Sequence, residues 1–392
     1  MPMFIARKME KILIDLASGY PAVALLGPRQ SGKTTLSQAT FKDYKYISLE
    51  NINERTFAQQ DPVKFLKTNE NEHGLILDEI QHVPELLSYI QTEIDAKDRP
   101  GYFILTGSQN FIVHQSVTQT LAGRVAILTL LPLSLQELKY ADQIKPTAEE
   151  CVLYGGYPRI YTKDLNPNKW YLNYVNTYIE RDVRQITRVI DLSIFERFLK
   201  LCAGRIGQIL NISALANECG ISHTTARQWI SILQASYIIF LLEPYYKNFN
   251  KRLIKAPKLY FYDTGLACAL LDLKEQQELR NNFYFGALFE SMIIGELFKS
   301  SYNKGDRPRI YFWRDNHGHE MDCVIEKGGQ LIPIEIKSGQ TIHPDFFKGL
   351  SWWYDNIENK PDNGYLIYGG EQNQMRSKGN VLGWQSDLND LT

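Results

Sequence analysis

Short apolar runs alternate with amphipathic stretches through the first third of the chain. Five runs have the length and composition of buried β-strands, at residues 21–26, 44–49, 74–79, 102–107 and 124–130, and the stretches between them are compatible with helices. Strands that alternate with helices indicate a mainly parallel sheet, and such sheets bind ligands at the carboxyl ends of their strands. We therefore expect an α/β domain with a site at that edge.

A glycine-rich loop, GPRQSGKT at residues 27–34, follows the first predicted strand and precedes a helical stretch. Gly27 and Gly32 permit backbone angles that turn successive amides inward, where the amides and the helix N-terminus bind phosphates. Lys33 adds a positive charge with a catalytic role, and Thr34 offers a hydroxyl to Mg²⁺. The loop therefore predicts binding of ATP and Mg²⁺. The predicted nucleotide contacts in this segment are Gly27, Pro28, Arg29, Gln30, Ser31, Gly32, Lys33, Thr34 and Thr35.

Polar side chains end the next two central strands. The run GLILDEI ends in Asp78 and Glu79. Asp78 is expected to hold Mg²⁺ directly or through water, and Glu79 to act as the general base for the attacking water. The alternative is a strand that ends in two surface acids. In YFILTGSQN, Ser108, Gln109 or Asn110 would sense the terminal phosphate, and Ser108 is taken as a nucleotide contact.

These motifs, together with LAGRVAILTLLPLSLQEL at 121–138, resemble the AAA+ ATPases, and within them the bacterial and archaeal group with a nuclease-like C-terminal domain. The resemblance implies ATP hydrolysis. The segment GGYPR at 155–159 resembles the Gly-x-Pro lid segment of related signalling ATPases, in which the proline lies near the adenine. Such ATPases often use an arginine from a neighbouring subunit. Arg124, Arg159 and Arg181 are the candidates, each with the alternative of an ordinary surface ion pair.

The middle of the chain has helix-turn-helix spacing in ISALANECGISHTTARQWISILQ at 212–234, with Gly220 at the turn. The residues expected on the inner faces of the two helices are Leu215, Ala216, Ala226, Trp229, Ile230 and Leu233. The outer face of the second helix would carry Ser222, Thr224, Thr225, Arg227 and Gln228, all able to bind phosphates or base edges.

Two β-rich stretches around a basic loop follow, which completes the pattern of a winged helix. Basic and aromatic side chains mix in this loop, namely Lys247, Lys251, Arg252, Lys255 and Lys258 with Tyr245, Tyr246 and Phe249. They predict a local anion-binding stripe. The DNA contacts predicted for the whole segment are Thr224, Thr225, Arg227, Lys251, Arg252 and Lys255. The alternative is a lid or packing module that does not contact DNA.

The last third shows a helix at 281–301, strands at 309–314, 320–326 and 331–337, a helix near 344–356 and the strand YLIYGG. This order resembles the core of PD-(D/E)xK nucleases. The resemblance implies that Asp322 and Glu335 bind Mg²⁺ and that Glu290 adds an acid near the metal. It also implies that Lys337 steadies the attacking water or the scissile phosphate. Glu335 and Lys337 are two apart on a strand and share a face. Such folds are also reused for binding alone. Trp352 and Trp353 are expected in the core.

The length of 392 residues favours several domains. We expect an α/β protein with a P-loop AAA+ domain at 1–145, a helical lid or connector at 146–193, a winged helix at 194–258 and a restriction-nuclease-like α/β domain at 259–392. The net charge of −1 excludes a protein coated in positive charge, so any nucleic-acid contact must be local. The five cysteines lack metal-ligand spacing and are expected to be reduced and buried.

The motifs together predict a Mg²⁺-dependent ATPase that binds, remodels or processes DNA, branched DNA included, with nuclease activity as a further candidate and homo-oligomers as a candidate assembly. The alternative is a signalling or regulatory switch ATPase with protein partners. A nucleotide-stabilised scaffold is the third hypothesis, and the intact Lys33, Asp78 and Glu79 argue against it. Because no signal segment or membrane span is visible, we expect a cytoplasmic protein without a membrane partner.

Overall fold

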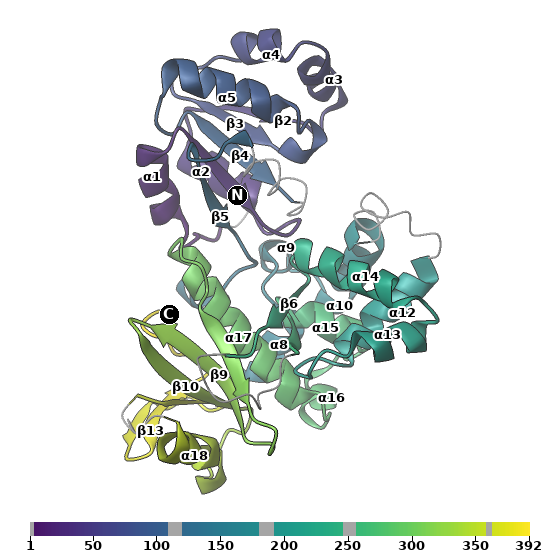
Figure 1. The fold of residues 1–392 in the computed structure, drawn as a ribbon, viewed down its shortest axis with the longest axis vertical. Coiled ribbons are helices and arrows are strands. Elements are labelled where there is room, and N and C mark those ends of the chain that lie inside the picture. The colour runs from purple at the N-terminus through teal and green to yellow at the C-terminus, as the bar shows by residue number, and fades with distance from the viewer. Residues whose placement is uncertain (1–3, 109–119, 180–191, 246–255, 358–362) are drawn as a thin grey trace. The chain divides into compact units, whose positions relative to one another are not determined.

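The computed structural model describes residues 4–108, 120–179, 192–245, 256–357 and 363–392 (Figure 1). The chain forms two compact units. The first contains Met1–Leu133 together with two short returning segments, Ala235–Tyr237 and Tyr302–Asp306. The second contains Ser134–Gln234, Ile238–Ser301 and Arg307–Thr392. The four-domain division expected from the sequence stays a prediction.

The first unit is built on a five-stranded parallel sheet in the order β2-β3-β4-β1-β5. All five strands expected from the sequence are present, which confirms the predicted α/β sheet. Their bounds are β1 Ala22–Leu26, β2 Lys45–Ser48, β3 Leu75–Asp78, β4 Phe103–Gly107 and β5 Val125–Thr129. The helices of this unit are α1 Glu10–Gly19, α2 Lys33–Thr40, α3 Ile52–Gln60, α4 Pro62–Thr68, the 3-10 turn Ile80–His82 and α5 Leu86–Lys97.

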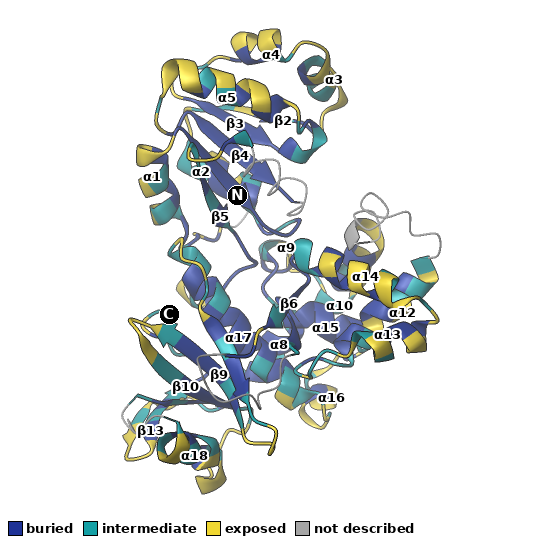
Figure 2. Cartoon of the chain, in the orientation of Figure 1, coloured by how far each residue is buried: buried dark blue, intermediate teal, exposed yellow. Residues whose placement is uncertain are grey.

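Alternation along β1 explains how both faces of this sheet are covered. Ala22, Ala24 and Leu26 point into one core, which α5 closes with apolar side chains such as Ile90. Val23 and Leu25 point into a second core beneath α1 and α2. Figure 2 shows these strands buried and the outer surfaces of α3, α4 and α5 exposed. A strand buried on both faces must be apolar throughout, which is the pattern that the sequence has here.

The helical part of the second unit contains the two helices of the predicted helix-turn-helix segment. Leu215 and Ala216 of the first and Ala226, Trp229, Ile230 and Leu233 of the second are buried, as the pattern predicts. Gly220 ends the first helix with φ 67°, a left-handed conformation that favours glycine. The helices of this part are α7 Leu135–Tyr140, α8 Ala148–Tyr154, α9 Pro158–Thr162, α10 Pro167–Tyr174, the π-turn Val175–Ile179, α12 Leu192–Ala203, α13 Ile212–Cys219, α14 His223–Ala235, α15 Thr264–Leu270, α16 Gln276–Arg280 and α17 Phe285–Asn303.

A buried carboxylate, Asp263, fixes the GGYP turn inside this unit. Its carboxylate accepts hydrogen bonds from the backbone N–H groups of Gly156 (2.7 Å) and Leu266 (3.2 Å). Burial raises the pKa of Asp263, although the side chain of Tyr171 and these backbone donors act to lower it. Strands β6 (Ile239–Leu242) and β7 (Lys258–Phe261) follow α14 and pair in antiparallel orientation.

The C-terminal part is a six-stranded mixed sheet in the order β12-β13-β11-β10-β9-β8. Its elements are β8 Ile310–Arg314, β9 Glu320–Lys327, β10 Gln330–Lys337, the 3-10 turn Pro344–Phe347, α18 Lys348–Asn356, β11 Tyr365–Tyr368, β12 Gln374–Arg376 and β13 Gly379–Gly383. Helix α17, the strands β8 to β11 and helix α18 were expected from the sequence, whereas β12 and β13 were not. Trp353 is buried against this sheet and Trp352 is partly buried beside it, which agrees with the expected packing role.

Two further expectations can be compared with the fold. All five cysteines are buried and free, and burial raises the pKa of the Cys151 thiol to about 12. Among the described helices, none combines the length and the apolar character that crossing a membrane requires.

Candidate functional site

The glycine-rich loop connects β1 to α2 in the first unit. Gly32 precedes the helix with φ 97°, and α2 begins at Lys33. Lys33 is buried, and its Nζ donates hydrogen bonds to the backbone oxygens of Gly27 (3.0 Å) and Pro28 (2.8 Å). The ammonium group therefore lies against the backbone of its own loop, where an anion bound by the loop amides would meet it.

The loop backbone is held so tightly that glycine is required at its first position. Gly27 has φ 151°, and a Cβ atom there would lie 2.1 Å from the backbone oxygen of Leu130. Within the loop, the buried hydroxyl of Ser31 has no hydrogen-bond partner among the described residues. A glycine-containing loop with a buried lysine and a hydroxyl that lacks a hydrogen-bond partner fits a phosphate chain, which would accept hydrogen bonds from these groups.

Asp78 is the polar centre beside this loop. The hydroxyl of Thr34 lies 3.0 Å from both of its oxygens, and the Tyr46 hydroxyl donates to Oδ2 at 2.8 Å. Thr106 donates a further hydrogen bond to Asp78. Burial and the neighbouring Asp78 raise the pKa of Tyr46, so this phenol remains a donor. The two predicted Mg²⁺ ligands of the first unit, Thr34 and Asp78, are thus in contact, and an oxygen-only donor set suits Mg²⁺.

Glu79 follows in a left-handed conformation with φ 59°. Its Oε2 accepts hydrogen bonds from Ser108 Oγ (2.9 Å) and from the side-chain amide of Gln81, which also donates to Ser108 (3.0 Å). Burial acts to raise the pKa of Glu79, but Lys33 and Arg29 outweigh it, and the pKa is lowered. The carboxylate therefore stays ionised, which is the state that a general base requires.

Arg7 is a component of this site that sequence reasoning missed. This buried side chain donates from Nη1 to the Ser31 backbone oxygen (2.7 Å) and from Nη2 to the Leu131 backbone oxygen (2.6 Å). It thereby ties the loop to the end of β5. Tyr46 and Thr106 were also missed, because only the parallel strand order brings them beside Asp78. Gln81 was missed although it lies two residues after Glu79 in the sequence.

The three candidate arginines are not distinguished by the structure. Arg124 forms an exposed ion pair with Asp95, with Nη2 and Oδ2 3.1 Å apart. Arg159 is exposed on α9. Arg181 lies outside the described residues, as do Gln109 and Asn110.

The outer face of α14 presents the side chains expected from its pattern. Thr224, Arg227 and Gln228 are exposed. Thr225 is partly buried, and its backbone N–H donates to Ser222 Oγ at 3.0 Å, so this pair is engaged at the start of the helix. The predicted DNA contacts Lys251, Arg252 and Lys255 lie outside the described residues, as do Lys247, Tyr246 and Phe249.

One member of the predicted basic stripe is placed differently from the expectation. Lys258 is not on an exposed stripe, because β7 carries it into the interior, where only 4% of its side chain is exposed. Its Nζ lies 3.4 Å from Glu290 Oε1 and contacts Glu320. Burial acts to lower the pKa of Lys258, but Glu290 and Glu320 outweigh it and the pKa is raised. Tyr245, expected in the same stripe, is also buried.

The predicted nuclease-like residues gather around Lys337 at the end of β10. Its Nζ lies 3.0 Å from Asp322 Oδ2 and 2.6 Å from Glu335 Oε2. Asp322 also accepts the backbone N–H of Ile336 at 2.8 Å. Glu335 fits because its neighbour in α18 is Gly349, where a Cβ atom would lie 1.6 Å from Glu335 Oε1. Burial and the neighbouring Asp322 raise the pKa of Glu335 despite Lys337.

Glu290 makes contacts of its own beside this pair. It accepts a hydrogen bond from Tyr260 and pairs with Lys258. Within the described part of the chain, no three His, Cys, Asp or Glu side chains are grouped to hold a metal ion. Asp322 and Glu335 fit a Mg²⁺ ion that keeps several waters and takes one or two carboxylates, which is its usual habit.

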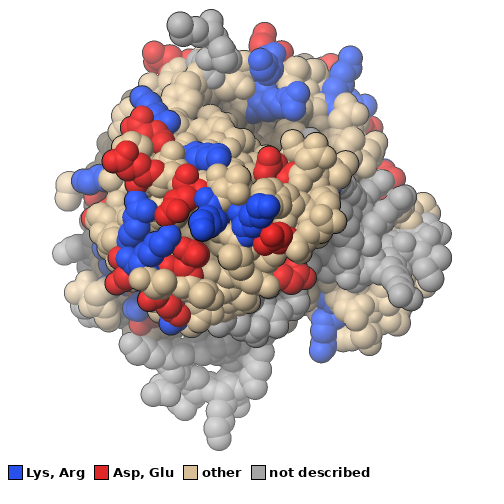
Figure 3. Space-filling model, turned by 90° about the horizontal axis from the view of Figure 1, so that it is seen from above, with Lys and Arg blue, Asp and Glu red and all other residues tan. Residues whose placement is uncertain are grey.

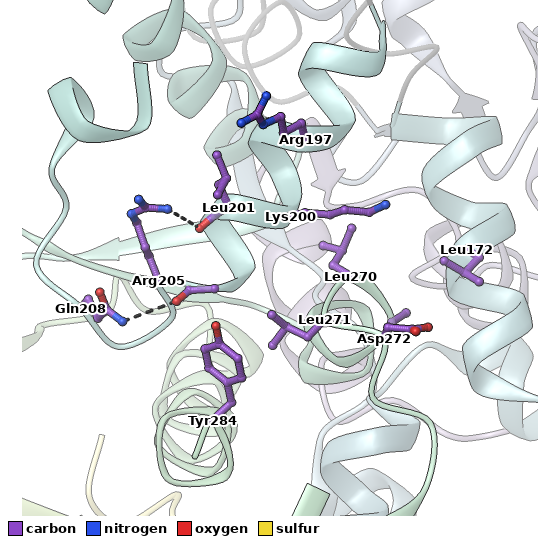
Figure 4. A pocket seen from close by; sticks show the side chains of 12 residues that line it. Leu172, Arg197, Lys200, Leu201, Arg205, Gln208, Leu270, Leu271, Asp272 and Tyr284 are labelled. Carbon is purple, nitrogen blue, oxygen red and sulfur yellow. Dashed lines mark hydrogen bonds between the residues drawn. The ribbon is translucent and has the colours of Figure 1, made fainter. Parts of the chain in front are cut away.

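A separate pocket of about 910 Å³ lies in the second unit (Figure 4). Arg197, Lys200 and Leu201 of α12 line it, with Leu270 at the end of α15 and Tyr284 just before α17. Figure 4 shows Arg205 turned back to donate to the Leu201 backbone oxygen (3.1 Å). None of the residues predicted to act in catalysis or binding lines this pocket. On the face drawn in Figure 3, acidic and basic side chains are interspersed, in keeping with the near-zero net charge.

Three family models match the chain in succession. Residues 19–139 match an AAA domain, residues 145–277 match the domain of unknown function DUF8612, and residues 285–386 match the domain of unknown function DUF4143. An uncharacterized protein of Mycobacterium tuberculosis is 29% identical over 82% of this chain and 71% of its own. An uncharacterized protein of Haemophilus influenzae is 22% identical over 79% of this chain and 80% of its own.

Some solved structures also show similarity to this chain. A Walker-type ATPase of Pyrococcus abyssi is 17% identical with a TM-score of 0.41, covering 68% of this chain and 96% of that one. The RuvB Holliday junction branch migration motor of Thermotoga maritima is 20% identical with a TM-score of 0.34, covering 60% and 90%. The AAA domain match coincides with the loop, Asp78 and Glu79, so the protein is an ATPase that carries an AAA domain at residues 19–139.

Proposed function

We propose that this ATPase is Mg²⁺-dependent and acts on DNA by binding, remodelling or processing it, branched DNA included. The observation that carries the DNA part is the exposed face of α14. Helices α13 and α14 bury their apolar sides, whereas Thr224, Arg227 and Gln228 face solvent on α14. The β6–β7 hairpin follows directly, which is the order of a winged helix, and hydroxyl, guanidinium and amide groups on the second helix suit phosphates and base edges.

The ATP site divides its work among a few side chains. Lys33 and the loop backbone from Gly27 to Thr35 bind and orient the phosphates, and Ser108 senses the terminal one. Thr34 and Asp78 hold the Mg²⁺ ion, which when bound neutralises charge on the phosphates. Glu79 takes the proton of the attacking water, and its contacts with Gln81 and Ser108 hold it for that role. An arginine from a second copy of the chain completes the site if the protein assembles.

We propose further that the C-terminal part processes DNA at Asp322, Glu335 and Lys337. Asp322 and Glu335 hold a Mg²⁺ ion, which supplies Lewis-acid activation of a phosphodiester when bound. Lys337 lies within hydrogen-bond distance of both carboxylates and about a third of its side chain is exposed to solvent, so it orients the water or the scissile phosphate. Two observations support this proposal. Glu335 and Lys337 lie on the same face of β10, and the ammonium group of Lys337 contacts both carboxylates.

A second candidate function is a signalling or regulatory switch with protein partners. The pocket of about 910 Å³ favours it, because leucine side chains line it beside cationic ones, which suits an acidic peptide with apolar side chains. The buried GGYP turn, which Asp263 holds, supplies an element that nucleotide could reposition in such a switch.

Steady-state ATP hydrolysis separates the two functions. The rate is measured without DNA and with single-stranded, duplex and four-way-junction DNA, at low and high salt, with Lys33→Ala as the blank. DNA action predicts stimulation by at least one form and loss of that stimulation at high salt, because phosphate contacts release counterions. An Arg227→Ala variant should keep the basal rate and lose stimulation. If no form of DNA changes the basal turnover, the result favours the signalling or regulatory switch instead.

A further inference from the structure

The acidic side chains of the nuclease-like site contact two different lysines, and this divides them into two groups. Asp322 and Glu335 share Lys337. Glu290 and Glu320 share Lys258, which comes from β7 and therefore from outside the C-terminal sheet. The two groups lie close enough that both Asp322 and Glu290 sense Lys258 electrostatically. The sequence resemblance had placed Glu290 with Asp322 and Glu335 around one metal.

The two lysines differ in how accessible they are. The side chain of Lys337 is 34% exposed, so water and ions reach the carboxylates that it contacts. The side chain of Lys258 is 4% exposed, its Nζ lies 5.5 Å from the centre of the Phe312 ring, and Tyr260 donates to the same oxygen of Glu290 that Lys258 contacts. An ion that entered the Glu290 group would have to displace a buried ammonium.

Buried carboxylates need a partner, because an unpaired buried charge costs several kcal/mol (order of magnitude). A divalent cation or an ammonium group can provide it. In the Glu290 group, the ammonium of Lys258 contacts both carboxylates, Tyr260 donates to Glu290, and Arg314 Nη1 lies 3.2 Å from Glu320 Oε2. Both carboxylates therefore already have cationic partners. Mg²⁺ demands near-octahedral oxygen ligands and retains waters, and such a closed group offers neither.

We propose that Lys258 is a built-in cation that takes the place of a second metal ion. The nuclease-like site then holds a single divalent cation, between Asp322 and Glu335, and Glu290 is a partner of Lys258 and not a metal ligand. This inference rests on the proposed Mg²⁺ site at Asp322 and Glu335 for the single ion, whereas the role of Lys258 can be tested without it.

The test counts Mn²⁺ ions bound per full-length chain by electron paramagnetic resonance, without nucleotide. An Asp78→Asn background removes binding at the ATP site, so that every ion counted belongs to the second unit. One ion per chain is expected. Asp322→Asn should abolish it, whereas Glu290→Gln should leave its affinity within about twofold. Loss of binding in Glu290→Gln as complete as in Asp322→Asn would overturn the proposal.

Removal of the lysine gives the complementary result. Lys258→Met should bind two ions per chain, and adding Glu290→Gln should return the count to one. Lys258→Arg keeps the charge and should remain at one. A count that stays at one in a folded Lys258→Met protein contradicts the proposal, and if that variant does not fold, the Glu290→Gln result decides. Absence of any ion in the Asp78→Asn background would refute the Asp322–Glu335 metal site alone. The gain of an ion in Lys258→Met would still support the role of Lys258.

Discussion

At the scale of single residues, the ATP site depends on side chains that hold other groups in place. Asp78 accepts hydrogen bonds from three hydroxyl groups, and Glu79 from a hydroxyl and an amide. These partners fix both carboxylates before any ligand arrives, which reduces the reorganisation that catalysis requires. Binding and turnover should therefore respond differently to substitutions at neighbouring positions.

The substitution Glu79→Gln separates those two properties. Glutamine keeps the shape of the side chain and can still pair with Ser108, but it cannot accept a proton from water. Turnover should fall by about 10²- to 10⁴-fold, the usual contribution of a general base. The affinity for ATP, measured with a fluorescent analogue, should change by less than about twofold. A turnover number that stays at the wild-type value would remove Glu79 from its assigned role.

A substitution of Arg7 should lower the affinity for ATP more than the turnover number, because Arg7 contacts the loop and not the reacting atoms. Arg7→Met removes two charge-assisted hydrogen bonds to the backbone oxygens of Ser31 and Leu131. Each such bond contributes about 1.5–3 kcal/mol, and about 1.4 kcal/mol is tenfold in affinity. The dissociation constant for ATP should rise about tenfold or more. Arg7→Lys should recover part of the affinity, since one ammonium group reaches one oxygen well and two poorly.

The readout for Arg7 must distinguish loop positioning from general loss of folding. The turnover number at saturating ATP should fall much less than the affinity, because the catalytic carboxylates keep their contacts. Equal losses of affinity and turnover, accompanied by a lower melting temperature, would show that Arg7 acts only on stability.

At the scale of elements, the sequence predicts what depends on local pattern and misses what depends on topology. The five parallel strands and the α13–α14 pair follow from periodicity and from Gly220, and both are present. Arg7 precedes α1 without any motif, and only the pairing of β1 with β5 brings Leu131 within its reach. The sequence placed Lys258 in an exposed basic stripe, but the structure buries it. The spacing of charged residues does not show which of several lysines a strand will carry into the interior.

The turn between α13 and α14 allows an element-scale prediction. A Cβ atom at Gly220 would meet nothing within 4 Å, but φ is 67°, so Gly220→Ala changes only the backbone energy. The free energy of unfolding should fall by about 1–2 kcal/mol, the cost of a left-handed conformation for an L-residue. Urea denaturation measures it. The matched control is Gly286→Ala, a helical glycine whose Cβ would meet only Ser338 Oγ, at 4.0 Å, and this substitution should be neutral or slightly stabilising.

This substitution also tests whether α14 acts on DNA as a rigid unit. Well below the denaturation midpoint, Gly220→Ala should bind DNA as the wild type does, because the exposed face of α14 is unchanged. A large loss of affinity at full folding would mean that the angle between the two helices, and not only the outer side chains, determines binding.

At the scale of the whole molecule, the first unit is not a simple N-terminal segment. Residues 235–237 and 302–306 return to it, and Tyr302 packs against the core beneath α1. Tyr237 is buried in the same unit, and burial raises the pKa of its phenol. A division of the chain at residue 133 or 145 would therefore leave apolar surface of this core uncovered. The core of the first unit consequently includes segments that lie far from residues 1–133 in the sequence.

This arrangement leads to a prediction for the intact chain. The loop at 27–34, Asp78, Glu79 and Ser108 all lie in the first unit, so a nucleotide bound by them should stabilise that unit. At a concentration about 100 times its dissociation constant, a non-hydrolysable ATP analogue with Mg²⁺ contributes about 2.7 kcal/mol. For a unit of this size that corresponds to an increase of roughly 5–20 °C in its melting temperature. Differential scanning calorimetry should show two transitions, of which one moves. Lys33→Ala should abolish the shift and Asp322→Asn should preserve it. If the nucleotide moved both transitions together, the two units would unfold as one, held together by the returning segments.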